Sequence, residues 1–193
     1  MKHTISRRKF LKLGMLAVAL PLPALADQGL SAAERRLCFH NLHTGEKADL
    51  AYWVQGDYVP ESLAEINRVL RDHRTGEVAA IDTQLLNLLA RVRAALGTSQ
   101  PFEVISGYRS PASNLMLVES TAGVAKRSLH LEGKAVDVRI PDIPLADLQR
   151  AGFMLRGGGV GYYPDSNFVH LDVGRVRAWE TQAPTRGSHP PLS

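Results

Sequence analysis

Two short segments, residues 134–140 and 167–174, constrain the fold of this chain more than any other feature of its sequence. They read "KAVDVRI" and "NFVHLDVG", and both alternate apolar with polar side chains. Successive side chains of a β-strand point to opposite faces of its sheet. Each segment therefore predicts a strand with one face against the core. In the first, Asp137 lies on the opposite face, where it can look into a cleft.

The polar face of the second segment carries His170 and Asp172. His130 comes just before the first segment, in "SLHLEGK", where Gly133 allows the chain to turn. With Asp137, these residues supply two imidazoles, one carboxylate and a spare carboxylate. Two imidazoles and a carboxylate suit a catalytic Zn²⁺ site whose fourth position is left to water, and zinc lowers the pKa of such a water from about 15.7 to about 7. The alternative is that both histidines are hydrogen-bonded polar groups in a cleft.

The remaining pattern predicts strands and helices that are mixed rather than strictly alternating. This favours an α+β domain with a small, mostly antiparallel sheet flanked by helices and a zinc site in a cleft on one sheet face. Alternation and turn residues predict four further strands, at 36–42, 47–54, 102–106 and 157–163. Apolar spacing and caps predict helices at 60–73, at 82–97, from Ser110 onward and at 144–152.

Residues 1–26 are typical of an export signal. A basic stretch is followed by the apolar "MLAVALPLPALA", which is too short to span a bilayer comfortably and ends in an A-x-A cleavage pattern. The adjacent Arg7 and Arg8 in "SRRKFLK" resemble a twin-arginine signal, although an ordinary secretory signal is the alternative. We expect export to the periplasm by the twin-arginine translocation machinery, with cleavage after Ala26. No cysteine follows that site, so we expect no membrane anchor after cleavage.

The charge of the exported part excludes a large class of functions. The signal contains five of the 23 basic residues and none of the 19 acidic ones, so the remainder has a formal net charge of −1. That balance argues against a nucleic-acid partner. The 193 residues suffice for one domain with a sizeable core, and we expect a monomer. The single cysteine, Cys38, excludes an intramolecular disulfide, and its apolar neighbours predict that it is buried.

Several motifs together resemble a known family. The pattern Ser-x-His-x-x-Gly-x-Ala-x-Asp-Val, the later strand histidine and the upstream "SGYRS" are similar to the D-Ala-D-Ala metallopeptidases. Those enzymes share a zinc site with lysostaphin-type enzymes and the hedgehog signalling domain. "GYYPDSNFVH" and "HLDVGRVRAW" resemble most the YcbK (MepK) type of murein endopeptidase. The resemblance covers roughly residues 35–180.

The resemblance implies a metal site and a substrate-binding residue. It implies three ligands of a single Zn²⁺ ion: His130, Asp137 and His170. It also implies that Arg109 of "SGYRS" binds the substrate and stabilises the developing oxyanion, a role that suits a guanidinium. Ser128 would line the site. The alternative for Arg109 is a surface ion pair with an acid such as Glu103.

One position departs from the family. Several branches place an acid three residues before the last histidine as general base, but here that residue is Asn167, which cannot take a proton. We favour Asp172 as the base, because it shares a strand face with His170, over Asp165 in the preceding turn. Asp172 would instead be a second-shell group if it orients a metal ligand.

The resemblance implies a zinc metallopeptidase domain at 36–180. Polar composition predicts a flexible leader at 27–35, and a composition rich in Pro, Ser, Thr and Gly predicts a disordered tail at 181–193. The expected activity of the domain is hydrolysis of the peptide crosslinks of cell-wall peptidoglycan. Two alternatives stay open, a D,D-carboxypeptidase that trims terminal D-amino acids and a non-catalytic, zinc-containing wall-binding domain. No long insertion offers to close one end of a groove, which favours the endopeptidase, whereas Asn167 favours the non-catalytic alternative.

Overall fold

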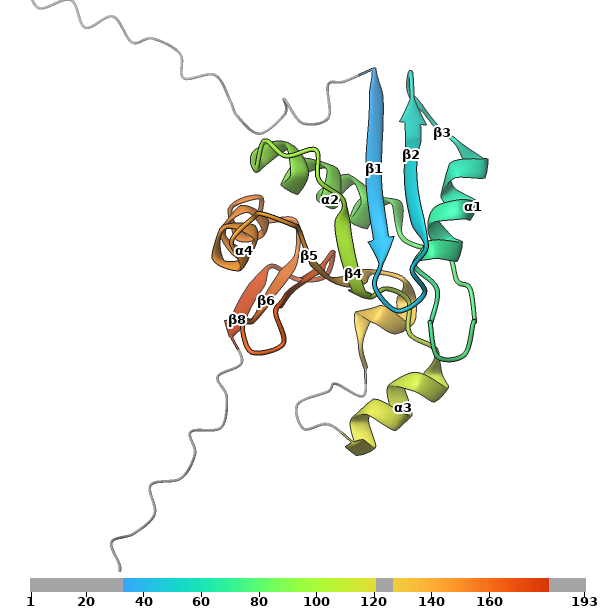
Figure 1. Ribbon diagram of the computed structural model, residues 1–193, viewed down its shortest axis with the longest axis vertical. Coiled ribbons are helices and arrows are strands. Elements are labelled where there is room, and N and C mark those ends of the chain that lie inside the picture. The colour runs from blue at the N-terminus through green and yellow to red at the C-terminus, as the bar shows by residue number, and fades with distance from the viewer. Residues whose placement is uncertain (1–32, 121–126, 181–193) are drawn as a thin grey trace, which may run out of the picture.

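The computed structural model describes residues 33–120 and 127–180 (Figure 1). The predicted signal at 1–26 and the predicted tail at 181–193 lie outside these described residues, as does most of the predicted leader. The first strand begins at Glu34, two residues earlier than expected, so the end of that leader belongs to the sheet. Within the described ranges, no helix combines the length and the apolar character needed to cross a bilayer.

The described part of the chain contains both helices and strands in mixed order, which confirms the predicted α+β class. In chain order the elements are β1 (Glu34–Asn41), β2 (Lys47–Val54), β3 (Asp57–Tyr58), α1 (Pro60–Val69), α2 (Thr83–Ala95), β4 (Phe102–Ser106), α3 (Pro111–Ser120), the 3₁₀ helix η1 (Leu129–Glu132), β5 (Ala135–Arg139), α4 (Leu145–Met154), β6 (Gly159–Tyr163), β7 (Phe168–Asp172) and β8 (Arg177–Glu180).

The eight strands form a single sheet in the order β3-β2-β1-β4-β5-β7-β6-β8. The pairs β1–β4 and β6–β8 are parallel, and the other neighbours are antiparallel. The prediction of a small sheet is therefore wrong, and the sheet is mixed, because two of its seven neighbouring strand pairs are parallel. β3 and β8 are too short to show alternation, and the crossover from β1 to β4 runs through two helices, so neither feature is visible in local patterns.

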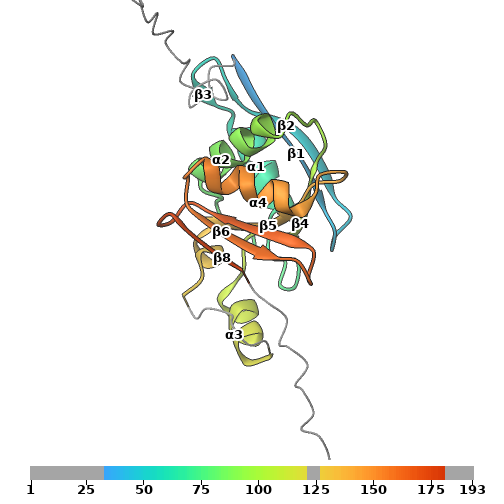
Figure 2. The same ribbon diagram turned by 90° about the vertical axis from the view of Figure 1, so that its left-hand side faces the viewer.

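The hydrophobic core lies between the sheet and the helices α1, α2 and α4, which share one side of it in Figure 2. Helix α2 shows why these residues form a helix. The Asp82 side chain accepts a hydrogen bond from the backbone of Gln84 and caps its start, and Gly97 follows its end at φ +61°. The apolar faces of β5 and β7 enter the same core, as predicted. Its buried strand and helix residues include Val136, Val138, Val169, Leu171, Leu85, Leu86, Leu89 and Val92.

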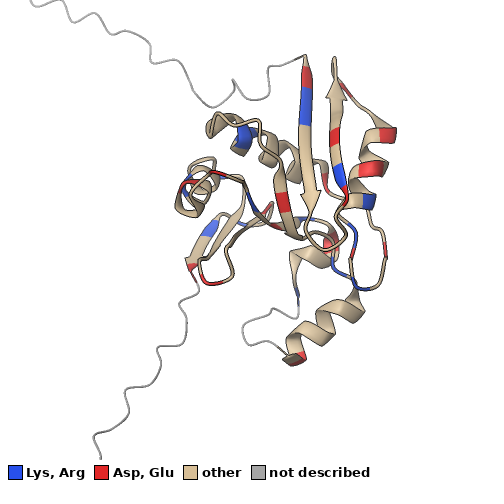
Figure 3. Cartoon of the chain, viewed as in Figure 1, with Lys and Arg blue, Asp and Glu red and all other residues tan. Residues whose placement is uncertain are grey.

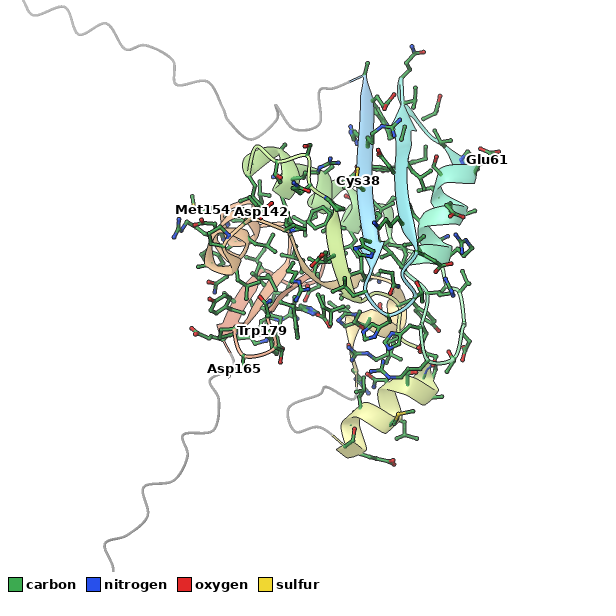
Figure 4. The ribbon with its side chains drawn as sticks, in the orientation of Figure 1. Cys38, Glu61, Asp142, Met154, Asp165 and Trp179 are labelled. Atoms are coloured by element: carbon green, nitrogen blue, oxygen red, sulfur yellow. The ribbon has the colours of Figure 1, made fainter. Side chains whose placement is uncertain are left out.

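The strands β1 and β2 are polar on their outer face. Figure 3 shows acidic and basic residues interspersed along β1, β2 and α1, and Arg36 in β1 pairs with Asp49 in β2 at 2.9 Å. Leu37 and Phe39 are the residues of β1 that the core buries. Cys38, labelled in Figure 4, lies between them on the opposite face and is partly exposed. The prediction of a buried Cys38 is therefore wrong, because strand alternation outweighs the apolar character of its neighbours.

The core packing of α2 gives a stability prediction. Leu89 is fully buried, so Leu89→Ala should lower the free energy of unfolding by about 2–5 kcal/mol through lost burial and the cavity left behind. The matched change Leu115→Ala in α3, where the leucine is 59% exposed, should alter it by less than about 0.5 kcal/mol. Chemical denaturation of both variants measures the difference, and equal losses would contradict this description of the core.

Candidate metal centre

The strand register aligns a row of residues across the face of the sheet that points away from α2. Directly paired residues of neighbouring strands point to the same face. The row runs from Ser106 in β4 through Asp137 in β5, His170 in β7 and Gly161 in β6 to Trp179 in β8. The predicted sharing of one face by Asp137 and His170 is thus confirmed by their direct pairing. These two residues form the centre of the candidate site.

Three side-chain atoms converge at this centre. His130 Nε2 lies 3.2 Å from His170 Nδ1 and 3.3 Å from Asp137 Oδ1, and the last two atoms are 2.8 Å apart. Ligands of a tetrahedral zinc ion at bond lengths of about 2.0–2.1 Å lie about 3.3 Å from one another. All three residues are buried, with relative exposures of 2–9%. The cluster is therefore able to hold a metal ion, and its donors are those that a transition metal prefers.

The 3₁₀ helix η1 delivers His130 to this cluster. The Ser128 hydroxyl caps η1 by accepting from the backbone N–H of His130 at 3.4 Å, and Gly133 ends it in the left-handed conformation at φ +64°. His130 Nδ1 lies 2.7 Å from the carbonyl oxygen of Gly107, to which it donates when Nε2 binds a metal. Ser128 thus positions His130, and its part in substrate binding stays a prediction.

The "SGYRS" segment is clamped beside η1 by its backbone. Gly107 packs so closely against α1 that a Cβ atom there would lie 2.3 Å from the carbonyl oxygen of Leu70. The buried carboxylate of Asp72 accepts from the backbone N–H of Ser110 at 2.7 Å. The backbone N–H of Arg109, between these two anchors, donates to the carbonyl oxygen of His130 at 3.1 Å. The position of Arg109 is therefore fixed relative to that histidine.

The Arg109 side chain points to the three converging ligand atoms and not to the surface. Its Nη2 lies 3.7 Å from Asp137 Oδ2, and the hydrogen bonds that the guanidinium donates to Asn114 and Ser106 are long, at 3.4 Å. Its Nε is buried and has no hydrogen-bond partner among the residues that the structure describes. A guanidinium held this loosely beside the candidate metal site can still donate hydrogen bonds to a carbonyl or carboxylate oxygen of a bound molecule.

The alternative partner proposed for Arg109 is occupied elsewhere. Glu103 lies on β4 and pairs with Arg139 of β5 at 2.6 Å. Burial is the main effect on Arg109 and lowers the pKa of its guanidinium below the usual value, but an arginine stays charged at neutral pH even so. Arg109 therefore brings a partly desolvated positive charge to the cluster.

The electrostatics of the cluster hold a proton where a metal ion would bind. Burial disfavours the charged form of His170, but hydrogen bonds to Asp137 and Asp172 outweigh it and raise the pKa of His170 to about 9. Burial likewise opposes ionisation of Asp137, yet the charges of His130 and His170 bring its pKa well below the usual range. A metal ion at these atoms must displace the proton on His170 Nδ1, as is general for histidine ligands.

Asp172, the favoured candidate for the general base, contacts the other nitrogen of His170. Its Oδ2 lies 3.1 Å from His170 Nε2, whereas Nδ1 faces the cluster. The carboxylate is fully buried and also accepts from the backbone N–H groups of Gly159 and Gly174 and from Arg177. Asp172 is thus on the far side of the imidazole from the three converging atoms, which is not the position that a general base requires.

The other residues considered for proton transfer lie in the turn between β6 and β7. Asp165 and Asn167 are both exposed, and Figure 4 shows Asp165 at the end of that turn. Asn167 has a positive φ of 54°, which asparagine tolerates better than most residues. The structure therefore does not bring either residue into the buried cluster.

Three residues on this face were not identified from the sequence. Trp179 lies with its ring centroid 5.3 Å from that of His170, and its indole N–H donates to the Tyr163 hydroxyl at 2.9 Å. Gly161 makes room for it, because a Cβ atom there would lie 2.6 Å from the indole ring. The sequence carried one signal for this contact, the two glycines two residues apart in "GGVGYY". Glycine inside a strand often marks a position that another segment of the chain approaches closely.

Comparison with known proteins identifies the family of this chain. The peptidase M15 family model described as "Peptidoglycan L,D-endopeptidase MepK" matches residues 30–179. The chain belongs to this family. Peptidoglycan L,D-endopeptidase MepK of Escherichia coli strain K12 is 42% identical over 181 residues, which cover 92% of this chain and 99% of the relative. The probable peptidoglycan L,D-endopeptidase MepK of Haemophilus influenzae is 38% identical over 178 residues, or 91% and 96% of the two chains. The family resemblance noted in the sequence is confirmed.

The converging ligand atoms predict the effect of removing one of them. His130→Ala should lower the affinity for Zn²⁺ by more than about 100-fold, because loss of a direct ligand should exceed the 10–100-fold cost of losing an outer partner. The matched change His40→Ala, in β1 and outside the cluster, should leave zinc affinity unchanged. Titration against a competing chelator, with elemental analysis of the purified proteins, measures both. Full zinc occupancy of His130→Ala would contradict the site.

Proposed function

We propose that this protein is a zinc-dependent endopeptidase that hydrolyses the peptide crosslinks of bacterial cell-wall peptidoglycan. One Zn²⁺ ion per chain is held by His130, Asp137 and His170. The observation that carries the proposal is the convergence of these three buried donors within 4.8 Å of one another, in a chain that belongs to the MepK peptidase family. Relatives named L,D-endopeptidase match nearly their whole length, which supports an L,D-peptide bond as the one cleaved.

The donor set supports zinc in particular. Two imidazole nitrogens and one carboxylate oxygen suit Zn²⁺, whereas Mg²⁺ and Ca²⁺ are bound mainly by oxygen ligands. When bound, zinc supplies a Lewis acid and lowers the pKa of water enough to provide a nucleophile at neutral pH. The protein contributes buried and fixed ligand side chains, and burial strengthens electrostatic interactions at the site.

Arg109 is proposed to bind the substrate beside the metal. Its guanidinium is close to Asp137, its Nε is unpaired among the described residues, and its backbone is tied to His130. A carbonyl oxygen of the substrate can take hydrogen bonds from it, and these strengthen as negative charge develops on that oxygen. Ser128, whose hydroxyl caps the start of η1, is also proposed to contact the substrate.

Digestion of purified crosslinked muropeptides, with mass analysis of the products, tests the activity. We expect crosslinked dimers to be converted to monomers and a chelator to stop the reaction. Arg109→Ala should lower kcat by about 100–1000-fold with zinc retained, as removal of an oxyanion-stabilising donor does. Arg139→Ala is the matched control, because that arginine pairs with Glu103, and it should keep nearly full activity.

Other products would support another function. Release of terminal D-amino acids without loss of crosslinks would indicate the D,D-carboxypeptidase. A zinc-loaded protein that binds peptidoglycan but cleaves no muropeptide would indicate the non-catalytic wall-binding domain, which the exposed Asn167 in place of an acid favours.

We also propose export to the periplasm by the twin-arginine route, supported by Arg7 and Arg8 in "SRRKFLK" and by the location of peptidoglycan outside the cytoplasm. Changing both arginines to lysine keeps the charge of the signal, so an ordinary secretory route should tolerate it, whereas a twin-arginine receptor should not. Cell fractionation should find the double variant in the cytoplasm. Export of that variant at the normal level would assign the ordinary route.

A further inference from the structure

Asp172 is a fully buried carboxylate with an unusual set of partners. Its Oδ1 accepts from the backbone N–H groups of Gly159 at 2.9 Å and Gly174 at 2.8 Å. Its Oδ2 lies 3.1 Å from His170 Nε2 and accepts from Arg177 Nη2 at 2.7 Å. Both oxygens are thus saturated, and neither is directed to the three atoms of the metal cluster. A buried carboxylate with this many donors is stable as an anion in a fixed orientation.

Arg177 supplies the charge that balances this anion. It lies in β8, and its guanidinium approaches both oxygens of Asp172, at 2.7 Å and 3.3 Å, in the two-pronged arrangement typical of arginine and a carboxylate. The guanidinium also lies 4.7 Å above the ring of Trp179, which restricts its orientation. Arg177 therefore fixes the orientation of the Asp172 carboxylate while Oδ2 also contacts His170.

Gly159 is the reason that Arg177 reaches Asp172. The strand β6 separates β8 from β7, so the arginine must pass over β6. Gly159 occupies the crossing point, where a Cβ atom would lie 2.4 Å from Asp172 Oδ2 and 2.5 Å from Arg177 Nη1. Any side chain at this position would displace one of the two partners. The pairing of Asp172 with Arg177 is thus built into the strand through a glycine.

The consequence for His170 follows from imidazole chemistry. A neutral imidazole carries its single proton on one nitrogen and a lone pair on the other. Asp172 is an acceptor at Nε2, so once a metal ion displaces the proton from Nδ1 the remaining proton stays on Nε2, and the lone pair of Nδ1 is directed to the metal beside Asp137 and His130. Only this tautomer can bind a metal ion at the cluster.

We propose that Asp172, charge-balanced by Arg177, is a positioning residue that fixes His170 as the Nε2–H tautomer with Nδ1 directed to the metal, and is not the general base. The inference rests on the proposed zinc site. It accounts for both oxygens of Asp172, for the location of Arg177 and for the glycine at position 159, none of which a general base requires.

The substitution Asp172→Asn separates the two roles. An amide presents one oxygen and one NH₂ group, but both sides of Asp172 face donors, so either orientation places the NH₂ group against a donor. With its oxygen toward the two backbone N–H groups, the amide donates to His170 Nε2 and moves the imidazole proton to Nδ1, where a metal ligand is required. We expect the affinity for Zn²⁺ to fall by about 10–100-fold, the usual cost of losing such a partner.

Two measurements other than activity read this out. Competition with a chromophoric chelator gives the zinc affinity, and imidazole ¹⁵N NMR gives the tautomer of His170. The unchanged protein should show a protonated Nε2 with zinc bound, and Asp172→Asn should show a smaller population of that form. At saturating zinc, Asp172→Asn should regain activity to within about tenfold of the unchanged enzyme. Asp165→Asn, in the exposed turn, is the matched control and should alter neither reading.

The opposite result would make Asp172 the general base. Unchanged zinc affinity and an unchanged Nε2–H tautomer, with activity lost by at least about 100-fold at full zinc loading, would overturn the proposal and support the general base. If Asp172→Asn does not fold, Gly159→Ala tests the same idea, because it keeps the carboxylate but displaces it from His170. A folded Gly159→Ala variant with unchanged zinc affinity would also overturn the proposal. Failure of the unchanged protein to bind zinc would instead reject the proposed function itself.

Discussion

The structure depends on burying four titratable side chains on one face of a sheet without leaving a charge unpaired. His130, Asp137, His170 and Asp172 are each at most 9% exposed. Burial of an isolated charge is costly, and it becomes tolerable only where hydrogen bonds and an opposite charge compensate. Here the compensation runs in a chain from the Gly107 carbonyl through the two imidazoles to Asp172 and Arg177. The surrounding backbone segments are placed so that each contact of this hydrogen-bonded series can form.

Close approach of backbone segments makes this series of hydrogen bonds possible. Gly107 lies against Leu70 so that its carbonyl oxygen meets His130, and Gly159 and Gly161 clear the surface of β6 so that side chains of β8 reach β7. A side chain at position 107 would collide with the backbone of Leu70, and one at position 159 or 161 would collide with Asp172 and Arg177 or with Trp179. The glycines thus serve the site by their small size, and their positions connect its parts from "SGYRS" to the last described strand.

The sequence predicted the central features of the site because they depend on local alternation. The faces of β5 and β7 follow from the period of two, and their polar positions brought Asp137 and His170 together as expected. The pairing of Asp172 with Arg177 was not predicted, because it depends on the parallel pairing of β6 with β8, a short strand that shows no alternation of its own. Which nitrogen of His170 faces the cluster is likewise a matter of side-chain geometry that residue spacing does not determine. The mixed sheet was missed for the same reason, since pairing between distant strands has no local signal.

A crystal structure of the zinc-loaded protein, with the metal located by its anomalous scattering, would show which atoms bind the ion. We expect one zinc ion bound by His130 Nε2, Asp137 and His170 Nδ1, with nitrogen ligands at about 2.0–2.1 Å and the carboxylate oxygen at about 2.0–2.2 Å. Arg109 should lie beside the metal, and His170 Nε2 should face Asp172. A zinc ion bound elsewhere, or bound through His170 Nε2 with Asp172 as a direct ligand, would contradict the proposed site.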